Sequence, residues 1–264
     1  MITVDDIKPH QESIWEDGAS HPAVDVLILA SCRGIAYANY LTEWNKLAGG
    51  VRVTYIRASD YHTTRDGQPQ NLDAALARLV ASSRFKQVME RTTHFIYEHH
   101  QNYGPLNTTE CADGGIMHQL WNKCAWSQIP SWNNHFVLED DIRACLPWFT
   151  KAANSMDRTE LAELLRHTTS HALFKFVQNT HQTNFPHFAE WFLRQWRTQR
   201  LFWTHNHVTK ALTEEVFNRL NMSLLDLPLT PQFWRAIKAM PDLYENPHTN
   251  PTPLDREVNG IQWD

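Results

Sequence analysis

Hydrophobic and polar positions follow two periodicities along the chain, one typical of strands and one typical of helices. Residues 24–30 form an apolar run rich in β-branched side chains, which predicts a buried strand of the kind found in parallel sheets. Small or polar residues occupy 31–34, and apolar positions then recur with helical spacing over about 33–46. The pattern therefore predicts a strand, a tight turn and a helix in this order.

The same periodicities predict elements along the rest of the chain. The predicted strands are 24–30, 51–57, 93–98 and 200–204, with a short extended piece at 129–138. The predicted helices are 33–46, 72–91, 114–125, 158–180, 186–199, 208–221 and one that starts at Pro231. Asp157 and Glu160 have the spacing of a capping box, and Pro231 suits a first helical position. Residues 1–22 are interpreted as a polar lead-in with one short helix, and 60–69 as a polar loop.

This alternation predicts an α/β fold with a mainly parallel open sheet, flanking helices and a helical insertion at about 140–199. We expect a single domain over 1–264, with an irregular, proline-containing tail from about 246. Ligands of open parallel sheets bind outside the carboxyl ends of the strands. The predicted strands with reactive side chains at their ends lead into Ser31-Cys32-Arg33, His99-His100 and His205-Asn206-His207. If one sheet holds all of these strands, their ends predict a site along one edge.

Composition excludes several classes of protein. The net charge of −5 argues against a broad surface for nucleic acid or for anionic membranes. No apolar run approaches the roughly 20 residues of a membrane span, and residues 1–16 do not resemble a signal peptide, so we expect a cytoplasmic protein. The scattered cysteines indicate neither a zinc knuckle nor a disulfide framework; they are Cys32, Cys111, Cys124 and Cys145.

The turn at 31–34 carries the candidate chemistry. A helix N-terminus favours the thiolate of Cys32, and Arg33 adds to this effect if it points inward. His207 is then the candidate base, and the backbone N–H groups of 32–34 are candidate oxyanion donors. In the alternative interpretation, Cys32 packs against the sheet and His207 caps the next helix.

Other reactive side chains leave further alternatives open. Ser31 is a competing nucleophile, although the G-x-S-x-G elbow of common hydrolases is absent. His205 and His207 have the spacing to chelate a metal in an extended segment, but no third ligand is evident and no metal is expected. Tyr103 lies after the His99-His100 pair and is a candidate pocket-lining ring, with packing as the alternative.

With these residues identified, the chain resembles the WcbI family of polysaccharide-biosynthesis enzymes, which are similar to coenzyme-A-binding acetyltransferases. Members of that family carry a strand followed by a G-N-C-Q-like turn, to which Ala30-Ser31-Cys32-Arg33 is similar. They also carry a late aromatic strand that ends in an Asn-His-Pro-like motif, to which residues 201–209 are similar. Serine and arginine replace asparagine and glutamine in the first motif, and Val208 replaces proline in the second.

The resemblance implies an acyltransferase that moves an acyl group, with acetyl expected, from an acyl-coenzyme A donor to a sugar or sugar-like acceptor. It implies Cys32 and His207 as catalytic residues. The candidate ligand contacts are Ser31, Arg33, Gly34, His99, His100, Tyr103, His205 and Asn206. The alternatives are a small-ester hydrolase that uses Ser31 or Cys32 with His207, and a non-catalytic α/β module that binds a phosphorylated ligand at the 31–34 turn.

Overall fold

The chain folds into two compact units. The computed structural model describes residues 14–57, 82–98, 116–130, 137–180, 185, 187–204, 207–245 and 250–264. Unit 1 comprises 1–131 with 217–241, and unit 2 comprises 132–216 with 242–264. Each unit has its own core.

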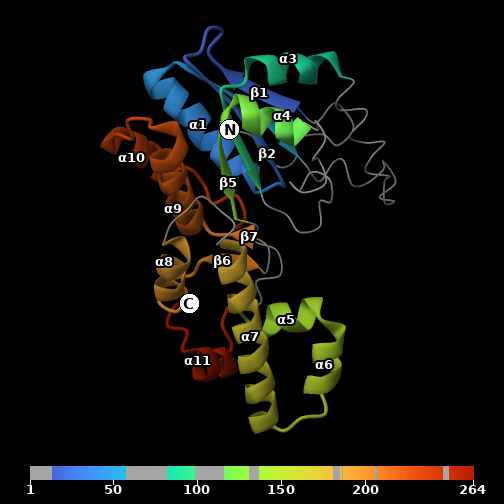
Figure 1. Ribbon diagram of the computed structural model, residues 1–264. Coiled ribbons are helices and arrows are strands. Elements are labelled where there is room, and N and C mark those ends of the chain that lie inside the picture. Colours follow the sequence, from blue (N-terminus) through green and yellow to red (C-terminus); the bar gives the residue numbers. More distant parts are fainter. Residues whose placement is uncertain are drawn as a thin grey trace. The chain divides into compact units, whose positions relative to one another are not determined.

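Unit 1 is built on a five-stranded sheet with the order β1-β3-β2-β4-β5. The strands are β1 (Ile14–Gly18), β2 (Val24–Ala30), β3 (Val51–Arg57), β4 (His94–Glu98) and β5 (Ala125–Ile129). Strands β3, β2, β4 and β5 run parallel, and β1 lies antiparallel to β3 at one edge. The predicted α/β fold with a mainly parallel open sheet is therefore confirmed (Figure 1).

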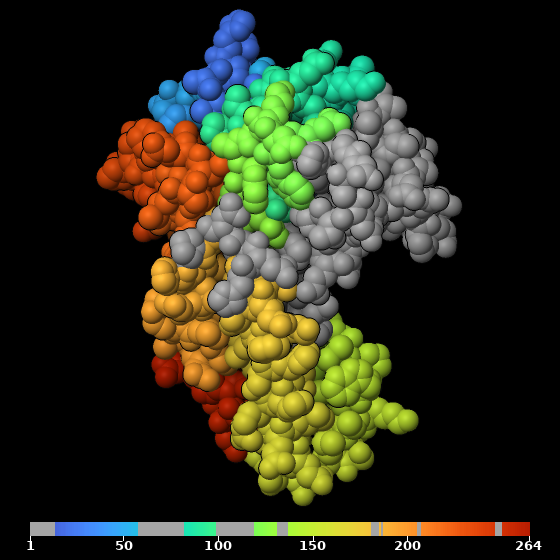
Figure 2. Space-filling view, viewed as in Figure 1, coloured from blue at the N-terminus to red at the C-terminus, as the bar shows by residue number. Residues whose placement is uncertain are grey.

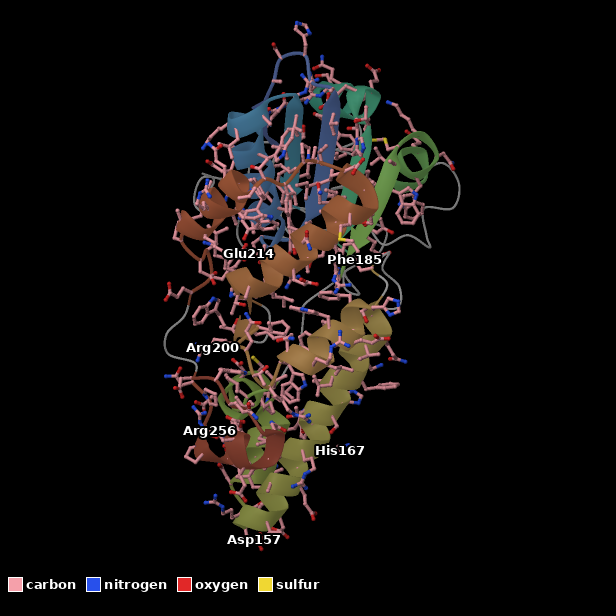
Figure 3. All side chains as sticks on the ribbon, turned by 90° about the vertical axis from the view of Figure 1, so that its left-hand side faces the viewer. Asp157, His167, Phe185, Arg200, Glu214 and Arg256 are labelled. Carbon is pink, nitrogen blue, oxygen red and sulfur yellow. The ribbon has the colours of Figure 1, made fainter. Side chains whose placement is uncertain are left out.

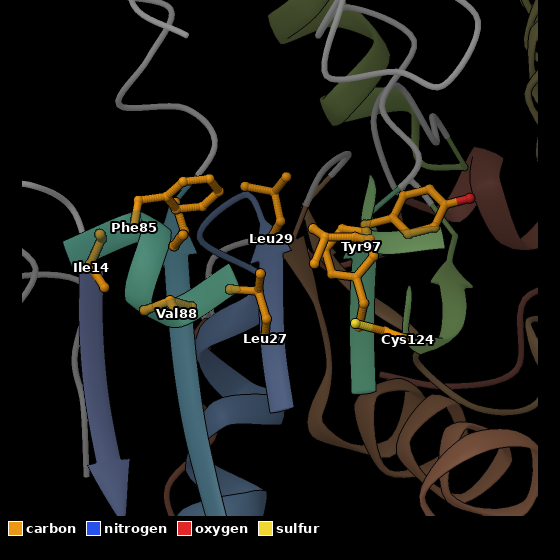
Figure 4. Packing of buried hydrophobic residues seen from close by; sticks show 10 residues of the cluster. Ile14, Leu27, Leu29, Phe85, Val88, Tyr97 and Cys124 are labelled. Atoms are coloured by element: carbon orange, nitrogen blue, oxygen red, sulfur yellow. The ribbon is translucent and has the colours of Figure 1, made fainter. Parts of the chain in front are cut away.

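Helices cover both faces of this sheet. The helices of unit 1 are α1 (Gly34–Ala48), α3 (Ser83–Arg91), α4 (Ile116–Lys123) and α10 (Pro231–Ala239), together with the end of α9 (Lys210–Leu220) and a π-helical segment, η4 (Asn221–Leu225). Leu27 and Leu29 pack with Phe85 of α3 on one face (Figure 4). Because side chains alternate along a strand, Ala30 and Tyr55 point to the opposite face, where α1 begins. Burial on both faces explains the apolar character of residues 24–30.

The sequence missed two strands of this sheet. Residues 14–18 were expected within a helical or irregular lead-in, but they form edge strand β1. Residue 125 was expected to end a helix and residue 129 to begin a later extended piece, but residues 125–129 form β5 beside β4. Both strands are inconspicuous because only Ile14 of β1 is buried, and because β5 buries the polar residues Ser127 and Gln128.

Unit 2 contains the predicted helical insertion. Its helices in this segment are α5 (Glu139–Cys145), α6 (Pro147–Ala153), α7 (Arg158–Thr180) and α8 (Phe188–Gln195). The predicted capping box is confirmed at the start of α7, where Figure 3 labels Asp157. The Asp157 side chain accepts from Glu160 N–H, and the Glu160 side chain accepts from Asp157 N–H. Side chains of α7 form a continuous part of the surface of this unit, yellow in Figure 2.

Two features of unit 2 differ from the expectations. Strand β6 (Phe202–Thr204) was expected in the parallel sheet, but it pairs antiparallel with β7 (His207–Val208) in a separate two-stranded sheet. Strands so close in sequence can pair only in the antiparallel sense. The tail was expected to be irregular, but Pro253–Asn259 forms helix α11, which begins with a capping box between Thr252 and Asp255.

Candidate functional site

The turn at 31–34 lies at the topological switch point of the sheet. Strand β2 pairs with β3 on one side and with β4 on the other, so the chain reverses its direction of winding beside β2. The carboxyl ends of β2 and β4 therefore flank the crevice where open α/β sheets bind ligands. Ser31, Cys32 and Arg33 follow β2 at this position, and Glu98 is the last residue of β4.

A buried carboxylate holds the turn. Glu98 Oε2 accepts a hydrogen bond from the Ser31 backbone N–H at 2.8 Å. Glu98 Oε1 accepts from Arg33 Nε at 2.8 Å and lies 2.5 Å from Arg33 Nη2. The side chains of Arg33 and Glu98 are only 4% and 1% exposed. On the other side of β2, the Tyr55 hydroxyl donates to the Ser31 carbonyl at 2.7 Å, so the turn is anchored to both neighbouring strands.

Several backbone N–H groups of the turn donate within the turn itself. Gly34 N–H donates to the Ser31 carbonyl at 2.9 Å, and Ile35 N–H donates to the Cys32 carbonyl at 3.1 Å. Arg33 N–H donates to Ser31 Oγ over a longer distance of 3.4 Å. The Gly34 and Arg33 donors expected for an oxyanion are thus engaged locally. Oxyanion binding at this turn stays a prediction.

The electrostatics of Cys32 correct one expectation. Its pKa is raised from the ordinary value, chiefly because burial disfavours the thiolate, and the Glu98 charge raises it further. Arg33 and Arg57 act in the opposite direction, and so does a backbone hydrogen bond from residue 33. The sequence predicted a favoured thiolate, but Cys32 is half-buried and Arg33 shares its charge with Glu98. The environment of Cys32 therefore disfavours its thiolate.

Sequence reasoning missed two charged residues at this edge. Arg57 ends β3 opposite Ala30, and Glu98 ends β4. Both are nearly buried, and both influence the pKa of Cys32. Their positions as the last residues of predicted strands were the available signal, because such residues lie at the ligand-binding edge of a parallel sheet.

Arg33 was expected to contact a ligand directly. The structure shows its guanidinium bound to Glu98 through Nε and Nη2, almost out of contact with solvent. This arrangement identifies a structural role for Arg33 in holding the turn. A direct contact between Arg33 and a ligand stays a prediction.

Gly34 allows the close packing of α1 on the sheet. A Cβ atom at this position would lie 2.7 Å from Ala30 Cβ and 2.7 Å from Tyr55 Cε2. We therefore expect Gly34→Ala to lower the free energy of unfolding by about 1–3 kcal/mol, through overpacking against these side chains. Urea denaturation of the wild type and of Gly34→Ala measures the effect. An unchanged midpoint for Gly34→Ala would refute the packing explanation.

His207, the expected base, lies in unit 2. It is the first residue of β7, and its backbone N–H donates to Thr204 Oγ1 at 3.2 Å. Its imidazole stacks on the Tyr244 ring, with centroids 4.9 Å apart and planes within 3°. The carboxylate of Asp242 accepts from Tyr244 N–H and from Lys210 N–H, and so links this ring to the start of α9. His207 is therefore a well-oriented side chain, and its role as a base stays a prediction.

The structure brings together only part of the predicted constellation. Ser31, Cys32, Arg33 and Gly34 share one turn at the edge of the parallel sheet. The sequence argument placed His207 along this edge through the strand at 200–204, and that step is wrong because β6 belongs to a separate sheet. The other expected contacts lie outside the described residues; they are His99, His100, Tyr103, His205 and Asn206.

The described part of the chain is also informative about metal ions and membranes. Among its residues, no group of three or more His, Cys, Asp and Glu side chains is arranged to hold a metal ion. None of the helices in the same ranges is long and apolar enough to cross a membrane. Cys32, Cys124 and Cys145 form no disulfide, and Cys111 lies outside these ranges.

Comparison with known proteins gives one distant likeness. No protein-family model matches the chain, and no curated protein matches it. A solved structure of WcbI, described as a novel polysaccharide biosynthesis enzyme in a native form without a disulfide bond between coenzyme A and a cysteine, is similar. It is 14% identical, the match covers 80% of this chain and 71% of that chain, and the TM-score is 0.47. The α/β fold of this chain follows from its own strand order and register.

Proposed function

We propose that this protein is an acyltransferase that uses an acyl-coenzyme A donor and acylates a sugar or sugar-like acceptor, with acetyl as the expected group. The observation that carries the proposal is the position of Cys32, which is half-buried in a turn at the switch point of a parallel sheet and lies next to Arg33, the N-cap of helix α1. The same turn carries the sequence motif that resembles the WcbI family. Both features support a ligand at this turn.

The charges around the turn fit an anionic or strongly polar donor. Arg33 and Arg57 contribute two positive charges near Cys32, and Glu98 contributes one negative charge. The N-terminus of α1 adds a partial positive charge at the same place. The local field therefore favours a developing negative charge, such as the oxygen of a thioester under attack. Arg33 and Arg57 are both proposed as candidates for a contact with donor phosphate.

The transfer itself breaks the thioester C–S bond of the donor and forms a C–O or C–N bond to the acceptor. The proton of the acceptor hydroxyl or amine must pass to a base, for which His207 is the proposed residue, and finally to the sulfur of coenzyme A. Cys32 acts either as a covalent nucleophile or as part of the thioester pocket. Its raised pKa means that the covalent route requires deprotonation during the attack.

One alternative within the same turn is disfavoured. Ser31 is only 5% exposed, and its backbone is held by Glu98 and by Tyr55. A nucleophile must reach its substrate, so burial favours Cys32 over Ser31 in both a transferase and a small-ester hydrolase. The raised pKa of Cys32 is the observation that favours a non-catalytic module for a phosphorylated ligand, in which the thiol is never ionised.

Binding of coenzyme A is the direct test of the proposal. We expect calorimetry to detect binding of coenzyme A and acetyl-coenzyme A, and weaker binding of pantetheine, which lacks the nucleotide phosphates. Arg57→Gln should weaken the binding of coenzyme A at least about tenfold and leave the binding of pantetheine unchanged. Arg33→Ala should also weaken the binding of coenzyme A, but this variant is less informative because it breaks the buried ion pair between Arg33 and Glu98. The absence of coenzyme A binding by the wild type at millimolar ligand would rule out the proposal and favour the hydrolase.

A further inference from the structure

We infer that Glu98 is a positioning residue for Cys32: its carboxylate fixes the turn that carries the thiol and offsets the Arg33 charge beside it. The inference rests on the proposed function for the use of Cys32, and on contacts of the turn for everything else. Nothing in the sequence motifs marks Glu98, which is the end of strand β4 and lies 66 residues beyond the thiol.

Glu98 fixes the geometry of the turn. The Glu98 carboxylate binds the residues on both sides of Cys32, because one oxygen accepts from Ser31 N–H and the other accepts from the Arg33 guanidinium. Two adjacent strands of the sheet, β2 and β4, are thereby joined at their carboxyl ends by a single side chain. The middle residue of such a clamped turn has little freedom to move. Cys32 is that middle residue.

Glu98 also alters the charge around Cys32. The charged groups that act on Cys32 from the described part of the chain are Arg33, Arg57 and Glu98. Glu98 is the anion of this set, and its carboxylate contacts both the Arg33 guanidinium and the Ser31 backbone N–H. The Tyr55 hydroxyl, which also faces the turn, donates to the Ser31 carbonyl. Neutralising Glu98 therefore leaves two guanidinium groups that both favour the thiolate.

Alkylation of Cys32 with iodoacetamide tests both the fixed geometry of the turn and the effect of the Glu98 charge. Mass spectrometry of the peptide follows the reaction over a range of pH. The midpoint of the rate profile gives the pKa of the thiol, and the plateau at high pH reports its accessibility. We expect Glu98→Gln to lower the pKa of Cys32 and thereby to speed alkylation at pH 7 by about tenfold. Cys145, a second half-buried thiol, is the internal control, and its profile should not change.

A paired variant covers the case in which Glu98→Gln fails to fold. Arg33→Gln with Glu98→Gln removes both buried charges, which folded proteins tolerate better than the loss of one partner. We expect its thiol pKa to stay near the wild-type value, while the plateau rate rises severalfold because the clamp is lost. A folded Glu98→Gln protein whose Cys32 pKa is unchanged or higher would overturn the inference. If that variant does not fold, an unchanged plateau in the paired variant would overturn it.

These outcomes separate the inference from the proposed function. The alkylation profile requires no coenzyme A, so a shifted profile without coenzyme A binding would refute only the proposed function. Binding of coenzyme A together with an unshifted profile in folded Glu98→Gln would refute only the role of Glu98. Circular dichroism of each variant verifies that the comparison is made on folded protein.

Discussion

Cys32→Ala is expected to reduce acyl transfer from acetyl-coenzyme A by at least about a thousandfold, if the thiol is the covalent nucleophile. The fold should survive, because contacts of Ser31, Arg33 and Glu98 anchor the turn. The measurement is a single-turnover assay with a sugar acceptor, in which mass spectrometry detects the acylated product. The melting temperature of the variant should lie close to that of the wild type.

Two controls make this result specific. Cys145→Ala removes another half-buried thiol, in α5, and should leave transfer unchanged. Ser31→Ala tests the competing nucleophile, and it should reduce transfer far less than Cys32→Ala does. Retained activity in Cys32→Ala with lost activity in Ser31→Ala would show that the thiol was the wrong choice. Unfolding of Cys32→Ala would instead identify Cys32 as a packing residue.

His207→Ala is the companion measurement for the proposed base. Stacking on Tyr244 orients the imidazole, so Tyr244→Phe, which preserves the ring, is the matched control variant. Loss of transfer in His207→Ala with an unchanged melting temperature would support a chemical role. If His207→Ala loses stability together with acyl transfer, the result would support a role in packing alone.

The strands that the sequence predicted correctly are those whose apolar character comes from burial on both faces. Residues 24–30 and 51–57 form β2 and β3 with the predicted bounds, because helices cover the sheet on either side. Strand β5 escaped prediction because Ser127 and Gln128 are polar yet buried. Pairing with β4, which depends on residues distant in the sequence, determines that β5 is a strand.

The helix starts that the sequence predicted correctly depend on local hydrogen bonds. Asp157 and Glu160 cap α7, and Thr230 caps α10 by accepting from Phe233 N–H. Thr252 and Asp255 carry the same signal at α11. There, the neighbouring prolines favoured an interpretation as irregular chain, although a proline at the first helical turn is compatible with a helix.

The candidate site shows the same division between local and distant information. The turn at 31–34 was predicted because the strand, the turn and the helix are adjacent in the sequence. Glu98 could not be connected to Cys32 until the register of β2 and β4 was known. The pKa of Cys32 was predicted in the wrong direction because burial outweighs the nearby positive charges, and burial is a property of the folded chain.

Loss of one member of the buried pair is expected to have the largest effect on stability. Arg33→Met keeps an apolar stem of similar length but leaves the Glu98 carboxylate, 1% exposed, without its guanidinium. We expect the free energy of unfolding to fall by about 3–5 kcal/mol, because an uncompensated charge stays buried. Urea denaturation followed by circular dichroism measures the change.

The matched variants decide whether charge burial is the cause. Arg33→Met with Glu98→Gln removes both charges and should recover most of the lost stability, since a neutral pair carries no desolvation penalty of this size. Arg158→Ala breaks the exposed pair with Glu257, whose side chains are 70% and 57% exposed, and should leave the urea midpoint unchanged. If Arg33→Met and the paired variant lose the same stability, burial of an unpaired carboxylate is not the cause of the loss. The positioning role of Glu98 would then lose its energetic basis, because a carboxylate that costs nothing when unpaired cannot be holding Arg33.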